Sequence, residues 1–168
     1  GLNAIASGDE VRGVVAVILQ SPQFLYRPEG VQLTPLERAS RLAHFLWGSA
    51  PDDPLLAAAE AGPFDVAAQA RRMLADPRAK DVVRRFHLQW LGVAHLSAVT
   101  KEAPGFAALA PLLEEETART AEWVVFDGTG DARRLFTGHT SFFNEALATH
   151  YGFSGFSGPA FVQADTDS

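Results

Sequence analysis

The 168-residue sequence contains no cysteine. Its absence excludes disulfides, thiolate metal sites, iron–sulfur clusters, a cysteine nucleophile and the C-x-x-C-H attachment of c-type haem. It does not fix the cellular compartment, because secreted proteins can also lack cysteine.

Basic surfaces and long apolar runs are also missing. Asp and Glu total 20 against 14 Lys and Arg, and no run of basic residues occurs. A nucleic-acid partner is therefore not expected, because phosphate contacts need a basic face. The longest apolar run, Gly13 to Leu19, is shorter than the roughly 20 residues of a membrane span, so we predict none. No signal peptide precedes it, and the chain begins with Gly1 rather than Met. We therefore interpret it as a processed product or a piece of a longer protein.

Sequence motifs of catalysis and metal binding are missing as well. The chain has no G-x-S-x-G, P-loop or G-x-G-x-x-G in a suitable context. Its histidines form no H-x-x-x-H, H-E-x-x-H or E-x-x-H. The sequence therefore predicts no metal site and no cofactor, and it favours no catalytic role for this domain alone.

Apolar residues make up 47% of the chain, and they recur at helical spacing between Pro and Gly breaks. Ser, Thr, Asp or Asn precedes most of these segments, as expected of N-caps, and Pro often follows the cap. No pair of strands with a hairpin signal is evident. We predict an all-α fold, a single domain of about six to seven helices. The expected helices are Asp9–Gln20, Thr34–Trp47 before Gly48, Leu55–Glu60, Val66–Leu74, Asp76–Leu91, Pro111–Phe126 and Asn144–His150, with one further turn at Arg133–Phe136.

The C-terminal end differs in composition. Phe153 to Gly158 is rich in Gly and Ser, and Ala164 to Ser168 is polar. We interpret residues 1–162 as the helical module and residues 163–168 as a linker to a following domain.

His87 lies in the run "RRFHLQWLG", residues 84–92. At about 100° per residue, Val82, Phe86 and Trp90 share a stripe that we expect to be buried, with His87 at its edge. We therefore interpret His87 as a packed histidine that bonds a backbone carbonyl or water. The alternative is a ligand or a proton carrier. His44 falls on the polar face of its helix, and non-covalent haem binding through His44 or His87 is a third possibility.

Glu114 is the carboxylate with the most unusual expected position. It projects towards Ala118, Ala121 and Val125, on the apolar flank of the sixth helix. There it must reach solvent, find a partner such as an Arg, or raise its pKa. A structural role is the main interpretation, and a catalytic carboxyl is the alternative. Convergence of Glu114, His87, Arg84 and Arg41 in one pocket would favour an enzyme.

Four separated blocks resemble a known family in their order: "SPQFLYR", "FLWGSAPDDPLL", "MLADPR" and "FFNEALATHYG". Together they resemble domain of unknown function number fifteen-ninety-two, from about Val14 to Val162. This family is a module of large, usually exported, planctomycete-type bacterial proteins associated with cytochromes. The resemblance implies an α-helical module flanked by other domains, located in the periplasm, on the outer surface or outside the cell. It supplies no reaction and no catalytic residues.

The expected function is a helical structural or interaction module of a larger exported multidomain protein. Its expected partners are neighbouring domains of the same polypeptide, and a haem protein is a further candidate. The alternative is part of an extracellular enzyme, either an oxidoreductase or a polysaccharide-acting enzyme, with its site at a domain junction.

Overall fold

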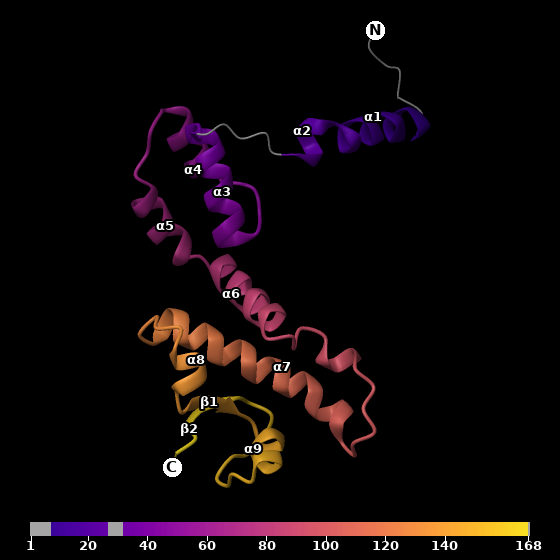
Figure 1. Ribbon diagram of the computed structural model, residues 1–168, viewed down its shortest axis with the longest axis vertical. Helices are drawn as coiled ribbons and strands as arrows, with labels where there is room; N and C mark the ends of the chain where they lie inside the picture. The colour runs from indigo at the N-terminus through magenta and orange to yellow at the C-terminus, as the bar shows by residue number, and fades with distance from the viewer. Residues whose placement is uncertain (1–7, 27–31, 168) are drawn as a thin grey trace.

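The computed structural model describes residues 8–26 and 32–167, and helices dominate it (Figure 1). The mainly helical fold predicted from the sequence is confirmed. The α-helices are α1 Gly8–Gln20, α2 Pro22–Leu25, α3 Pro35–Trp47, α4 Asp53–Glu60, α5 Val66–Leu74, α6 Pro77–Trp90, α7 Phe106–Glu122, α8 Arg134–Thr137 and α9 Glu145–Tyr151. A 3₁₀ turn, η1, spans Leu96–Ala98, and a π-helical segment, η2, extends α7 over Trp123–Asp127.

Helix α3 illustrates how the caps set the helix boundaries. The Glu37 backbone N–H donates to Thr34 Oγ1 at 3.2 Å, and Thr34 N–H donates to Glu37 Oε2 at 2.7 Å. These two bonds form the predicted capping box. Gly48 ends the helix with a φ of 63°, a left-handed conformation that glycine adopts without strain. Side chains also cap four later helices: Asp52 before α4, Asp65 before α5, Asp76 before α6 and Asn144 before α9.

A small antiparallel sheet was not expected from the sequence. Strand β1, Thr140–Phe143, pairs with β2, Val162–Asp165, and Phe143 lies opposite Val162. The strands carry no hairpin signal because α9 lies between them in the chain. Residues 163–165, expected in a linker, are part of β2.

Helix α7 begins at Phe106, earlier than the predicted start at Pro111. Gly105, with a φ of 78°, precedes it, and Pro111 lies inside the helix. The sequence prediction placed Pro at the first helical position, its most common place. The α-helix then gives way at Trp123 to the π-helical segment, which buries Val124.

Most of the buried residues form two clusters, one at each end of the part of the chain from α3 to β2, while Ala110, Ala118, Ala121 and Val124 of α7 and η2 are buried outside both. The first cluster lies among α3, α4, α5 and the start of α6, and is made of Ala39, Ala43, Trp47, Leu55, Ala59, Met73 and Ala79. The second is made of Phe143, Leu147 and Ala148, with partly buried residues of α7 and the C-terminal segment around them. Helices α6 and α7 pack against each other between the two ends (Figure 1).

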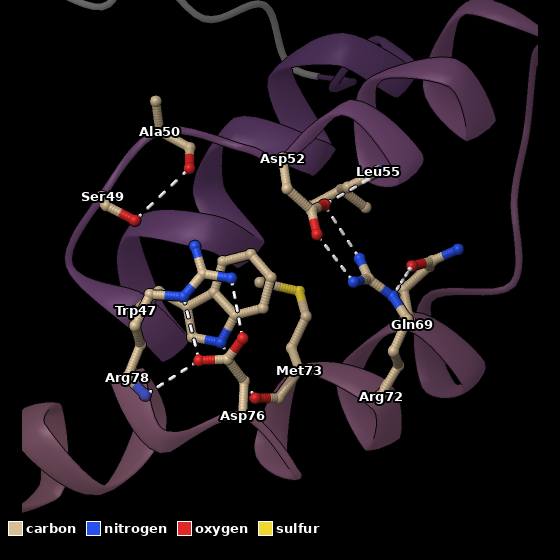
Figure 2. A network of polar contacts seen from close by, with 10 residues as sticks. All are labelled: Trp47, Ser49, Ala50, Asp52, Leu55, Gln69, Arg72, Met73, Asp76 and Arg78. Atoms are coloured by element: carbon tan, nitrogen blue, oxygen red, sulfur yellow. Dashed lines mark hydrogen bonds and ion pairs between the residues drawn. The ribbon is translucent and has the colours of Figure 1, made fainter.

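Trp47 is at the centre of the first cluster, and polar contacts surround it (Figure 2). Its Nε1–H donates to the Met73 carbonyl at 2.9 Å, which ties α3 to α5. The Arg78 guanidinium lies 3.4 Å from the centre of the Trp47 ring and also donates to the Asp76 carboxylate. This bond is the main cause that lowers the pKa of Asp76 to about 2. The guanidinium of Arg72 binds both oxygens of Asp52, at 2.7 and 2.9 Å.

Candidate functional site

His87 is buried, with 8% of its surface exposed. Its Nδ1 lies 2.7 Å from the Val83 carbonyl oxygen, one turn back on α6. The ring meets Phe86 edge-on, with centroids 5.1 Å apart. This is the backbone bond that the packed interpretation predicted, and it occupies one of the two ring nitrogens.

The predicted burial of Phe86 and Trp90 is wrong, because these side chains are 57% and 54% exposed. The face of α6 that meets α7 is instead polar at its margin. Lys80 Nζ lies 2.9 Å from Glu122, and Arg84 pairs with both Glu115 and Glu122. In this orientation of α6, Ala79 and His87 are buried, and Phe86 and Trp90 face outward. The stripe residues do share one face of α6, as predicted, but Phe86 and Trp90 on that face are not buried.

Glu114 has a structural contact rather than an Arg partner. Its Oε1 accepts from the Ser97 backbone N–H at 2.7 Å and from the Ser97 hydroxyl at 2.8 Å. These bonds, led by the backbone N–H, lower the pKa of Glu114. The carboxylate therefore fixes η1 against α7, and its ionised state at neutral pH does not suit a general acid.

His44 is exposed on α3, and its Nδ1 lies 2.8 Å from the Ser40 carbonyl oxygen. Glu114, His87 and Arg84 each bond a different group: Ser97, Val83 and the carboxylates of α7 respectively. Neither Arg41 nor any of these three lines the two surface depressions described next. The candidates from the sequence therefore do not share either depression.

The first depression, the apolar groove, has a volume of about 430 Å³. Helices α3 and α6 form its long walls, with contributions from α5 and η2. The lining residues are His44, Phe45, Leu46, Leu74, Ala79, Val82, Val83, Phe86 and Val125. Phe45 is 77% exposed on its rim. His44, a candidate from the sequence, thus belongs to a wall of this groove and not to a cluster of ligands.

An aromatic row extends the groove along α6 towards α8. Phe86 stacks on Trp90 with centroids 6.1 Å apart, and Trp90 meets Phe136 edge-on at 5.8 Å. All three are more than half exposed. Large contiguous patches of exposed apolar surface are common where proteins bind partners.

The second depression, the polar cleft, has a volume of about 380 Å³. Glu116 of α7 lies in it and accepts from Ser141 Oγ at 2.7 Å and from Tyr151 Oη at 3.0 Å. Burial, and then the charge of Glu116, raises the pKa of Tyr151 to about 12. The lining residues are Leu91, Glu116, Thr117, Thr120, Arg134, Leu135, Gly138, His139, Thr140, Ser141, Tyr151 and Thr166.

Neither depression was predicted from the sequence. The polar cleft draws on α7, α8, β1, α9 and the segments after α6 and β2, so no local motif contains its residues. The exposed groove follows from the orientation of α6. Within residues 8–26 and 32–167, no group of three or more His, Asp or Glu is placed to hold a metal ion. The helices of the described part are also too short or too polar to cross a membrane.

No curated protein and no solved structure shows significant similarity to this chain. A family model does match: the one described as PSD4, protein of unknown function (DUF1592), over residues 33–153. The match contains α3 to α9 and both walls of the apolar groove, and it begins after α1 and α2. Since it covers well over half of the sequence, the chain belongs to the DUF1592 family.

Proposed function

We propose that this chain is a helical interaction module of a larger exported multidomain protein, and that its apolar groove docks a helical segment of that protein. The observation that carries the proposal is the exposed apolar surface made by the groove and the aromatic row. A groove between two packed helices accommodates the apolar face of a third helix.

Covering the apolar groove and the aromatic row with a bound segment is favourable in free energy. Fully burying one large apolar side chain contributes about 1.5–3 kcal/mol. Phe45, Phe86 and Trp90 forgo much of that contribution because each is more than half exposed. Buried Trp residues in particular often dominate the binding energy of protein interfaces. A segment that covers these three rings would recover the free energy of their burial.

Support for export and for a haem-protein partner comes from the resemblance to exported, cytochrome-associated proteins. Fractionation of the native cells, followed by detection of the full-length protein, tests the location. Export predicts recovery outside the cytoplasm. Recovery in the cytoplasm alone would contradict it.

Hydroxyl-radical footprinting tests the docking. The oxidation rates of Phe45 and Phe86 are compared between the 168-residue chain, diluted until light scattering shows monomers alone, and the undiluted full-length product of the open reading frame. We expect several-fold slower oxidation in the full-length protein, because the docked segment excludes solvent from both rings. Val99 serves as the control, since it is 53% exposed and lies outside the groove. Equal oxidation of Phe86 in the two proteins would contradict the proposed docking.

The polar cleft favours a second candidate function, part of an extracellular enzyme with its site at a domain junction. The Glu116 carboxylate accepts hydrogen bonds from two hydroxyls, those of Ser141 and Tyr151, and a carboxylate held beside hydroxyls in a cleft is a common component of acid–base sites. This candidate predicts that Glu116→Gln abolishes an activity of the full-length protein. Full activity in that variant would leave only the interaction module.

A further inference from the structure

Helix α1 has an uncovered apolar stripe. Val11, Val14, Val15, Ile18 and Leu19 follow the spacing i, i+3, i+4, i+7, i+8, which places them on one face of the helix. Each of these five side chains is between 45% and 61% exposed. Gln20 lies on the opposite face, and Val17 lies about 60° outside the edge of the stripe, beyond Val14, at 100° per residue. Within residues 8–26 and 32–167, α1 therefore presents an exposed apolar stripe, and α3 and α6 form an apolar groove.

The dimensions of the two surfaces agree. From Val11 to Leu19 the stripe is about 12 Å long, at 1.5 Å per residue. On α6 the groove extends from Ala79 to Phe86, which is about 10 Å by the same measure. The groove walls are apolar side chains apart from His44, so the valine and isoleucine side chains of the stripe meet matching chemistry.

We propose that the occupant of the apolar groove is the α1 stripe of a second copy of this chain. The inference rests on the proposed docking function and names the docked segment. In the structure, α1 and α2 lie away from the groove of their own chain (Figure 1). A mutual exchange of α1 between two copies fills both grooves and covers both stripes, and it closes with two-fold symmetry.

The absence of cysteine allows a selective cross-linking test. One batch of chain carries Val14→Cys and a second batch carries Phe86→Cys, and the two are mixed under mild oxidation. We expect a covalent heterodimer, because the exchange brings α1 of one copy onto α6 of the other. A batch with Gln20→Cys on the opposite face of α1 is the matched control and should cross-link far less. Equal cross-linking by Val14→Cys and Gln20→Cys, or none by either, would overturn the exchange.

A chain that carries both Val14→Cys and Phe86→Cys separates exchange from folding back. Between copies, oxidation produces covalent dimers. Within one chain, it produces an oxidised monomer, and that result would also overturn the proposal. Circular dichroism of each variant verifies that it retains its helices, and Val125→Cys replaces Phe86→Cys if the latter unfolds the chain.

Light scattering measures the same association without cross-links. Ile18→Glu places a charge in the stripe, and we expect it to weaken dimerisation roughly tenfold or more, because the charge would have to be buried. Val17→Glu is the matched control, since Val17 is β-branched like Ile18 and is 73% exposed against 55% for Ile18, but lies outside the stripe. Identical dissociation constants for the two variants would overturn the role of the stripe.

These results are distinguishable from the footprinting result. A chain that stays monomeric and does not cross-link, while Phe86 is protected in the full-length protein, removes α1 as the occupant and retains the docking function. Loss of protection in the full-length protein removes the docking function itself.

Discussion

Trp47 shows at the scale of a single residue how three helices are joined. Its indole is buried, its N–H donates to the Met73 carbonyl, and its ring face carries the Arg78 guanidinium (Figure 2). Trp47 of α3 thus contacts both α5 and α6. Buried Trp usually finds a partner for its N–H, and here that partner is backbone, which no surface substitution removes.

We expect Trp47→Phe to lower the free energy of unfolding by about 1–2 kcal/mol, because it removes one hydrogen bond and weakens the cation–π contact. Trp47→Ala should lower it by about 3–5 kcal/mol, because it also leaves a cavity. Urea denaturation followed by circular dichroism measures both. A smaller loss in Trp47→Ala than in Trp47→Phe would contradict this account.

The lowered pKa of Asp76 predicts that the stability of the chain depends on pH. Its pKa of about 2 in the folded chain is below the ordinary 3.8, so folding favours the ionised form. The stabilisation is therefore complete above about pH 4 and is lost as the pH falls through 2. Asp76→Asn keeps the capping oxygen that accepts from the Arg78 N–H and removes the charge. We expect the wild type to be more stable than this variant at pH 7, and the difference to shrink as the pH falls from about 4 to 2 and to vanish below 2, as measured by thermal denaturation.

Helix α7 shows, at the scale of an element, where a local rule misleads. Pro111 lacks the N–H that would bond the carbonyl of the preceding turn, so it is unfavourable inside a helix. The helix nevertheless includes it, because Ala110 directly before it and Ala118 and Ala121 further along are buried on one face. Tertiary packing therefore overrides the local preference.

We expect Pro111→Ala to stabilise the chain by about 1 kcal/mol. The restored hydrogen bond and the removed steric clash outweigh the greater entropy that the unfolded chain gains. Pro111 is exposed, so no packing is lost. Thermal denaturation monitored by circular dichroism measures the change, and an unchanged or lower stability would show that the proline is needed at this turn.

The boundaries of most helices were predictable because their signals are local. Thr34 with Glu37 and Asp76 with Pro77 each lie within a few residues of the helix start that they define. The orientation of α6 was not predictable, since it depends on Glu115 and Glu122 of another helix. The same limit applies to the candidate sites. The packed position of His87 could be predicted from the residue spacing within its own helix. The polar cleft could not be predicted in this way, because Glu116, Ser141 and Tyr151 come from three different elements.

At the scale of the molecule, two buried clusters are joined through α6 and α7. Arg84 spans this junction by pairing with Glu115 and Glu122, and all three side chains are only partly exposed. Ion pairs of this kind contribute more than those on an open surface, because water screens them less.

We expect Arg84→Gln to lower the free energy of unfolding by about 1–2 kcal/mol, since it leaves Glu115 and Glu122 without one cation. Arg85→Gln is the matched control on the exposed face of α6 and should change stability by less than about 0.5 kcal/mol. Chemical denaturation of both variants provides the measurement. Equal effects would mean that the junction does not depend on the ion pairs.

Because η2 extends α7, one continuous helical rod contributes to the walls of both depressions. Val125 in η2 lines the apolar groove, while Glu116 and Thr120, earlier on the same continuous rod, line the polar cleft. Because this rod contributes a wall to each depression, we expect binding in one depression to change the affinity of the other. Thermodynamic linkage requires any such influence to be reciprocal and of equal size in both directions. Titration of a synthetic α1 peptide into the wild type and Glu116→Gln measures it, and identical affinities would mean that the two ends respond independently.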